Sequence, residues 1–110
     1  MSWLVELEQN TIIPQDWRGF AQCHASTLLA LPNGDILVAY MAGGGEAKPD
    51  MAIWLSRRTN GEWLPPQRIQ HRYLLAHWNP VLHRDDETGT IFLYYKVGNT
   101  VQNWYTLVST

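Results

Sequence analysis

Apolar residues occur along this chain in short blocks separated by turn-forming residues, without the three- and four-residue spacing of an amphipathic helix. The pattern predicts β-strands, and no segment is a convincing helix. The expected strands cover residues 4–7, 26–31, 36–41, 51–57, 67–69, 80–83, 91–96 and 103–108. We therefore expect an all-β protein.

The residues between these blocks favour turns. The run Pro-Asn-Gly-Asp at 32–35 suits a tight hairpin because Asn and Gly tolerate positive φ, and the run at 85–89 suits a longer one. Four prolines, at positions 14, 49, 65 and 66, lie between expected strands, where the missing N–H removes no bond from a sheet.

Two parts of the chain resemble each other. When residues 26–56 are set against 80–109, Leu28 aligns with Leu82 at an offset of 54 and Tyr40 with Tyr95 at an offset of 55. Each part contains a strand, a glycine turn, an aromatic-ended strand, a polar loop and a third strand. A repeat of this length suggests one blade of a β-propeller, and the alternative is a chance likeness of two hairpin-rich segments.

Composition excludes several classes of protein. The 110 residues are 45% hydrophobic and 16% charged, with 6 Trp, so the chain should fold. Its formal net charge of −2 offers no basic surface for nucleic acid or an anionic membrane, and neither is expected as a partner. Cys23 has no second cysteine to pair with. The N-terminus lacks the features of a signal peptide and no apolar stretch approaches ~20 residues, which predicts a cytoplasmic location.

Residues 56–63, Ser-Arg-Arg-Thr-Asn-Gly-Glu-Trp, resemble a degenerate Asp box, the turn motif Ser-x-Asp-x-Gly-x-Thr-Trp of the sialidase superfamily. Ser56, Gly61 and Trp63 have counterparts in the motif, whereas Arg58 replaces its Asp and Glu62 its Thr. In that superfamily the box joins the third and fourth strands of a blade.

Other runs resemble the N-terminal part of bacterial sialidase-like proteins with BNR repeats, described as predicted neuraminidases. They are Cys-His-Ala-Ser-Thr-Leu at 23–28, Leu-Pro-Asn-Gly-Asp at 31–35, residues 49–58, His-Trp-Asn-Pro-Val-Leu at 77–82 and residues 92–98. The resemblance covers roughly residues 20–110. It implies antiparallel four-stranded blades of a sialidase-like β-propeller, about two per chain. Residues 1–110 would form one partial unit, with a lead-in and N-terminal strand at 1–22, a first blade at 23–70 and an incomplete second blade at 77–110.

The resemblance also implies which residues to test for catalysis. Sialidases place three arginines, an Asp acid/base and a Tyr–Glu nucleophile pair at the propeller axis, and the neutral Tyr suits an anionic sugar. His24 stands where the first arginine is expected, and Glu46 and Asp50 lie in the loop that should carry the Asp. Glycines at 43–45 replace a further arginine, and the remaining arginines, the Tyr and its Glu have no counterparts in these residues. The chain should thus belong to a class that acts on acidic sugars but lack the complete catalytic machinery.

Polar residues expected near one rim form the candidate site. The catalytic candidates are His24, Glu46, Asp50 and His77, and the substrate-binding candidates are Trp78, Asn79 and Lys96. Two histidines with carboxylates would suit proton transfer in a polysaccharide lyase or a non-sialidase hydrolase. The 53-residue spacing of the histidines has no metal-ligand signature, and no cofactor is expected. Structural hydrogen bonding for the histidines and core packing for the tryptophans are the alternatives.

Three functions remain open at this point: a carbohydrate-active sialidase-like segment, a self-assembling lectin-like module and an inactive structural remnant. Two blades leave two apolar sheet faces without neighbours. We therefore expect either a homo-oligomer, for example three copies that close a six-bladed ring, or a part of a longer chain.

Overall fold

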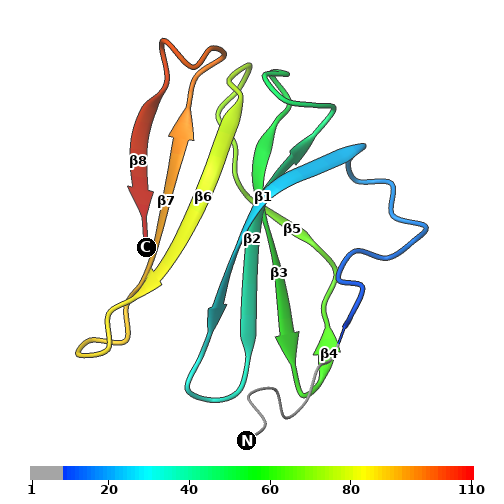
Figure 1. The fold of residues 1–110 in the computed structure, drawn as a ribbon, viewed down its shortest axis with the longest axis vertical. Coiled ribbons are helices and arrows are strands. Elements are labelled where there is room, and N and C mark those ends of the chain that lie inside the picture. Colours follow the sequence, from blue (N-terminus) through cyan, green and yellow to red (C-terminus); the bar gives the residue numbers. More distant parts are fainter. Residues whose placement is uncertain (1–8) are drawn as a thin grey trace, which may run out of the picture.

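A computed structural model describes residues 9–110, which fold into two antiparallel β-sheets (Figure 1). The first sheet contains β1 (Gln22–Ala30), β2 (Ile36–Gly43) and β3 (Ala52–Thr59), and β3 also pairs with the short β4 (Glu62–Trp63) and β5 (Gln67–Gln70). The second sheet contains β6 (His77–Arg84), β7 (Ile91–Val97) and β8 (Tyr105–Ser109). The described part of the chain has no helix, and so none that could span a membrane. The predicted all-β fold is confirmed.

Seven of the expected strands correspond to seven of the observed ones. The expected strand at 4–7 lies outside the described residues. The two-residue strand β4 was not expected. It completes the outer edge of the first sheet together with β5, so this sheet has the four strand positions of a blade, the outermost one divided in two.

Strand register repeats between the two sheets. In each sheet a residue of the first strand pairs with one of the second, which pairs in turn with one of the third. These sets are Leu28, Val38 and Ser56 in the first sheet, and Leu82, Leu93 and Ser109 in the second. The aligned residues therefore occupy equivalent positions, as expected of two consecutive propeller blades.

A bulge also repeats. The pairing of β1 with β2 shifts register within 24–27, and the pairing of β6 with β7 shifts within 78–81. Each bulge contains one residue in the left-handed region, Ala25 with φ 56° and Asn79 with φ 46°. Residues other than glycine adopt such φ values rarely. The first strand of each sheet, β1 or β6, would be the innermost strand of a blade, and both of these innermost strands have a strained turn at the same place.

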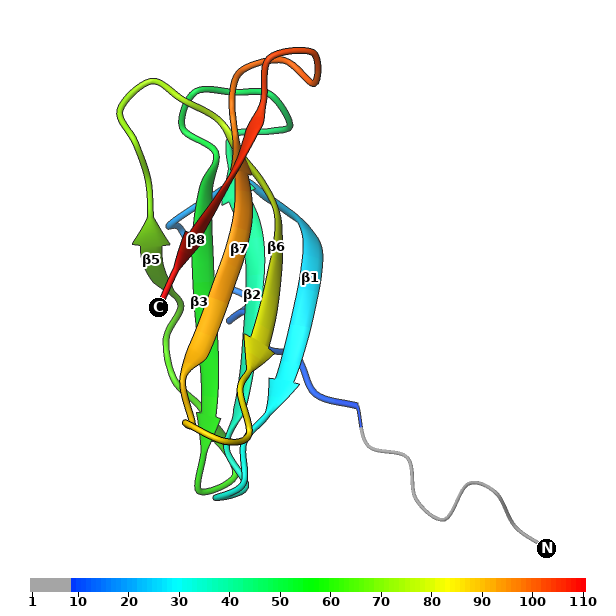
Figure 2. The same ribbon diagram turned by 90° about the vertical axis from the view of Figure 1, so that its left-hand side faces the viewer.

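The two sheets stack face to face, and in Figure 2 the second sheet lies in front of the first. Their innermost strands are adjacent, and the Leu82 N–H of β6 lies 3.4 Å from Thr27 Oγ1 of β1. Buried residues between the sheets form the main core: Ala39, Met41 and Ile53 from the first sheet, and Trp78, Leu93, Tyr95 and Val97 from the second.

Residues 12–20 cover the opposite face of the first sheet. The Phe20 ring packs edge-on against Tyr40 and Trp54, with centroids 5.9 and 5.0 Å away, and Trp17 meets Trp54 at 6.1 Å. The face of the second sheet that points away from the first sheet is uncovered in the described residues. There Val81, Tyr94 and Val108 pair across the strands and are 53%, 39% and 56% exposed.

Candidate functional site

Three loops lie at the same end of the two sheets, where β1 and β6 begin (Figure 1). We call this end the rim, formed by residues 43–51, 71–76 and 98–104. Backbone hydrogen bonds join the loops, since the His77 N–H donates to Met51 O at 2.8 Å and the Gly98 N–H donates to Ala76 O at 3.0 Å. The rim is therefore a connected surface built from both blades.

Asn99 ties two of these loops together with its side chain. Its Oδ1 accepts the Ala76 N–H at 2.8 Å, and its Nδ2 donates to Leu74 O at 3.1 Å. Leu74 itself has a positive φ of 59°. Asn99 was not among the residues predicted from the sequence, because a polar residue in a polar loop carries no signal of its own.

His24 and Asn79 are two candidate residues that both lie next to Met41. Both are exposed on the innermost strands. His24 pairs across the sheet with Met41, and the Asn79 N–H lies 3.4 Å from Met41 Sδ. The His24 Nε2 lies 3.2 Å from Gln22 Oε1. An imidazole and a carboxamide are thus available next to the repeated bulges.

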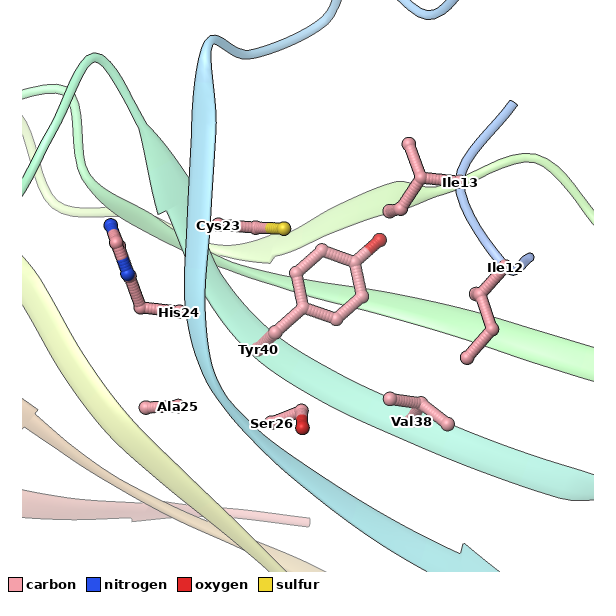
Figure 3. A pocket seen from close by; sticks show the side chains of 8 residues that line it. All are labelled: Ile12, Ile13, Cys23, His24, Ala25, Ser26, Val38 and Tyr40. Carbon is pink, nitrogen blue, oxygen red and sulfur yellow. The ribbon is translucent and has the colours of Figure 1, made fainter. Parts of the chain in front are cut away.

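Cys23 and His24 project to opposite sides of β1. Figure 3 shows the Cys23 and Tyr40 side chains on one side of β1 and the His24 ring on the other, and all three residues line a pocket of about 300 Å³. The Tyr40 hydroxyl lies 2.8 Å from Ser56 Oγ, and burial raises its pKa, which keeps it neutral. The alternation of side chains along a strand therefore separates the thiol from the imidazole.

Asp50 lies on the other face of the first sheet from this pair. Both of its carboxylate oxygens accept the Gly44 N–H, at 3.1 and 3.0 Å, and this closes the β2–β3 loop. A Cβ at Gly43 would lie 2.8 Å from Asp50 O, so the loop closes this tightly only with glycine there. Asp50 lines a cavity beside Trp54, whereas Glu46 is exposed on the same loop.

His77 is fully buried beneath the rim. Its Nδ1–H donates to Leu75 O at 2.9 Å, which makes Nε2 the acceptor for the Arg72 N–H at 3.2 Å. Its ring stacks on Tyr95, with centroids 5.8 Å apart. Burial lowers the pKa of His77, and both ring nitrogens are occupied, so this histidine holds the 71–76 loop in place as a neutral ring.

Trp78 and Lys96 are a second pair of candidates, aligned across β6 and β7, and both make contacts within the chain. Trp78 is buried, and its Nε1–H donates to Gly98 O at 2.6 Å. The Lys96 ammonium lies 5.1 Å from the ring centroid of Trp104 and donates to Thr106 Oγ1 at 3.1 Å. Residues 9–110 contain no group of three or more His, Cys, Asp or Glu side chains that could hold a metal ion.

The family follows from a comparison with known families. Residues 34–110 match the model of the BNR repeat-like domain. The chain belongs to the BNR repeat-like family. This match covers most of both sheets and agrees with the sialidase-like resemblance of the sequence. A search of curated proteins finds no match to this chain.

In this BNR repeat-like chain, the run that resembles an Asp box forms the β3–β4 hairpin. Asn60 and Gly61 form its tip with φ of 52° and 79°, and Arg58 pairs with Trp63 across the turn. Two successive positive φ values match the twist of the flanking strands. The turn therefore keeps its place between the third and fourth strands although the Asp of the motif is absent.

Proposed function

We propose that this BNR repeat-like chain is a segment of a sialidase-like propeller that binds carbohydrate where β1 and β6 meet the rim. The proposal rests on one observation: the repeated bulges leave His24 and Asn79 exposed beside the same methionine, Met41. Bulges are over-represented next to functional sites, where they re-aim a side chain.

The chemistry of these side chains suits sugar hydroxyls. The Asn79 carboxamide supplies two donors and an acceptor, and the His24 imidazole supplies ring nitrogens that can form further hydrogen bonds. Glu46, exposed on the neighbouring loop, is the charged group proposed for this site, whereas Lys96 shares the outer face of the second sheet with Tyr94 and would act only from there. No cofactor enters the proposal.

A hydrolase or polysaccharide lyase is the second candidate, favoured by the exposed imidazole of His24. In such an enzyme His24 would take the proton and Glu46 would be the carboxylate, since Asp50 lies on the other face of the sheet and His77 uses both nitrogens for loop contacts. His77 would then act by positioning the 71–76 loop.

Binding of a panel of neutral and acidic oligosaccharides tests the proposal. We expect His24→Ala and Asn79→Gly to weaken binding at least about tenfold, because each removes hydrogen bonds worth about 1.4 kcal/mol or more. Glycine at 79 accepts the positive φ, so this variant removes the side chain alone. His83→Ala changes an exposed histidine elsewhere on β6 and should bind like the parent chain. Unchanged binding in both site variants would refute the site, and sugar release that His24→Ala abolishes would favour the enzyme.

We also propose that a second copy of this chain covers the outer face of the second sheet. The equivalent face of the first sheet, which includes Ala39 and Leu55, packs against the second sheet. The row Val81, Tyr94 and Val108 occupies the same repeat positions and is exposed. In a head-to-tail contact this row would pack on residues 12–20, which cover the first sheet of the next copy, and such contacts would allow a closed ring.

A further inference from the structure

A cavity of about 490 Å³ lies between residues 17–21 and the outer face of the first sheet. It is on the opposite side of that sheet from His24 and Asn79. Aromatic side chains form part of its wall and charged side chains another part. The aromatic residues are Trp17, Phe20 and Trp54, and the charged ones are Arg18, Asp50 and Arg68.

The charged groups leave the cavity positive. Neither Arg18 nor Arg68 forms an ion pair with any of residues 9–110, whereas the carboxylate of Asp50 already accepts the Gly44 N–H. The cavity wall therefore contains two positively charged side chains and one negatively charged one. Arginine binds carboxylates through paired N–H donors, and a partner held away from bulk water strengthens such bonds.

The indole of Trp17 adds an unused donor. Its Nε1 is buried and has no hydrogen-bond partner. A buried N–H without an acceptor costs about 1–3 kcal/mol, so most such groups in folded proteins have one. Trp17 lines the cavity, but its Nε1 lies against Gly19, so a ligand oxygen supplies the missing acceptor only if the indole turns toward it.

We propose that this cavity binds a hydroxylated ring that carries a carboxylate, such as a hexuronate. Arg18 and Arg68 bind the carboxylate, and a ring oxygen or hydroxyl accepts the Trp17 N–H. Asp50 accepts a hydrogen bond from a ring hydroxyl through its remaining lone pairs, which favours a sugar over an aromatic acid. The aromatic wall contacts the C–H groups of the ring. This site is separate from the one at β1 and β6, so either can exist without the other.

A titration of the indole N–H resonances tests the proposal on the full chain. The chain has 6 Trp, and Trp17→Phe identifies the Trp17 signal by its loss. We expect D-glucuronate to shift that signal with a Kd of about 1 mM, which a ligand of this size reaches at modest ligand efficiency. D-glucose, benzoate and inorganic phosphate should each bind at least about tenfold more weakly.

Matched arginine variants complete the test. Arg68→Gln and Arg18→Gln should each weaken glucuronate binding at least about tenfold, whereas Arg72→Gln, which changes an exposed arginine outside the cavity, should not. His24→Ala should also leave the titration unchanged. The proposal is overturned if glucuronate leaves the Trp17 signal in place or if glucose, benzoate or phosphate binds equally well. It is also overturned if both cavity arginine variants, shown to be folded by the remaining indole signals, bind as the parent does.

Discussion

Ala25 has the left-handed backbone that side chains other than glycine usually avoid, with φ 56° in the bulge of β1. This conformation costs an L-residue about 1–2 kcal/mol, whereas glycine adopts it freely but loses about 0.5–1 kcal/mol of chain entropy. We expect Ala25→Gly to leave the free energy of unfolding unchanged or to raise it by up to about 1 kcal/mol. Urea unfolding measures the difference.

Ala30→Gly is the matched control for this prediction. Ala30 ends the same strand, is exposed and pairs with Ile36 without a positive φ. Glycine there should lower the free energy of unfolding by about 0.5–1 kcal/mol. Equal losses in the two variants would contradict a left-handed bulge at Ala25.

His77 makes the fold sensitive to acid. Burial lowers its pKa, and the nearby positive charge of Arg72 and the His71 ring, 5.5 Å away, act in the same direction. The unfolded chain therefore binds a proton near pH 6.5 that the folded chain does not bind until lower pH. The contribution of His77 is present above pH 6.5 and is lost as the pH falls through the folded pKa.

Urea unfolding at pH 7 and pH 5 checks this sign. We expect the parent chain to lose more stability between these pH values than His77→Gln, which has no imidazole to protonate. His83→Gln should behave like the parent, because His83 is exposed. Asp35 and Asp85 have lowered pKa values, so their contributions are lost only below about pH 3.8, outside this window. An identical loss in the parent and His77→Gln would refute the prediction.

The placement of His77 also shows why the sequence did not distinguish the environments of the two candidate histidines. His77 pairs with Val97 as Cys23 pairs with Ala42, so His77 is the counterpart of Cys23, whereas His24 corresponds to Trp78. One position along a strand exchanges the two faces of a sheet. Two histidines 53 residues apart thus have opposite environments although both stand at the start of an innermost strand.

At the scale of elements, the rim loops depend on Asn99. Asn99→Ala would leave the Ala76 N–H and Leu74 O without partners, and such losses cost about 1–3 kcal/mol when buried and less in exposed loops. We expect a decrease of about 1 kcal/mol in the free energy of unfolding and faster hydrogen exchange at the Ala76 amide. Asn103→Ala, in the same loop, removes no side-chain hydrogen bond to any of residues 9–110. It should therefore change neither quantity. Unaltered exchange at Ala76 would contradict the role of Asn99.

The strands were predictable because short apolar blocks alternate along the chain with turn-forming residues. The bulge interrupts this alternation, so β1 begins at Gln22, four residues before the expected start. The two residues of β4 form a strand only because they pair with Arg58 and Thr59. The cavity residues Arg18 and Arg68 lie in an irregular segment and on the outermost strand, and the tertiary fold alone brings them together.

At the scale of the whole molecule, the two blades differ in whether their outer faces are covered. Residues 12–20 cover the Val38 and Tyr40 face of the first blade, where they leave cavities between themselves and the sheet. The Val81, Tyr94 and Val108 face of the second blade has no cover among residues 9–110. A repeat unit buries its core by stacking on neighbours, and this uncovered face is therefore the surface at which we propose that a second copy binds.

Self-association of the chain should therefore depend on Tyr94. Its ring lies at the centre of the exposed row, paired with Val81 on one side and Val108 on the other. We expect light scattering to show a mass that rises with concentration, and Tyr94→Lys to reduce it to the monomer, because a lysine there would have to bury its charge between stacked sheets. Tyr73→Lys, at an 85% exposed tyrosine on the rim, should associate as the parent does. A parent chain that stays monomeric at all concentrations, or a Tyr94→Lys variant that still associates, would show that copies of this chain do not stack through the second blade.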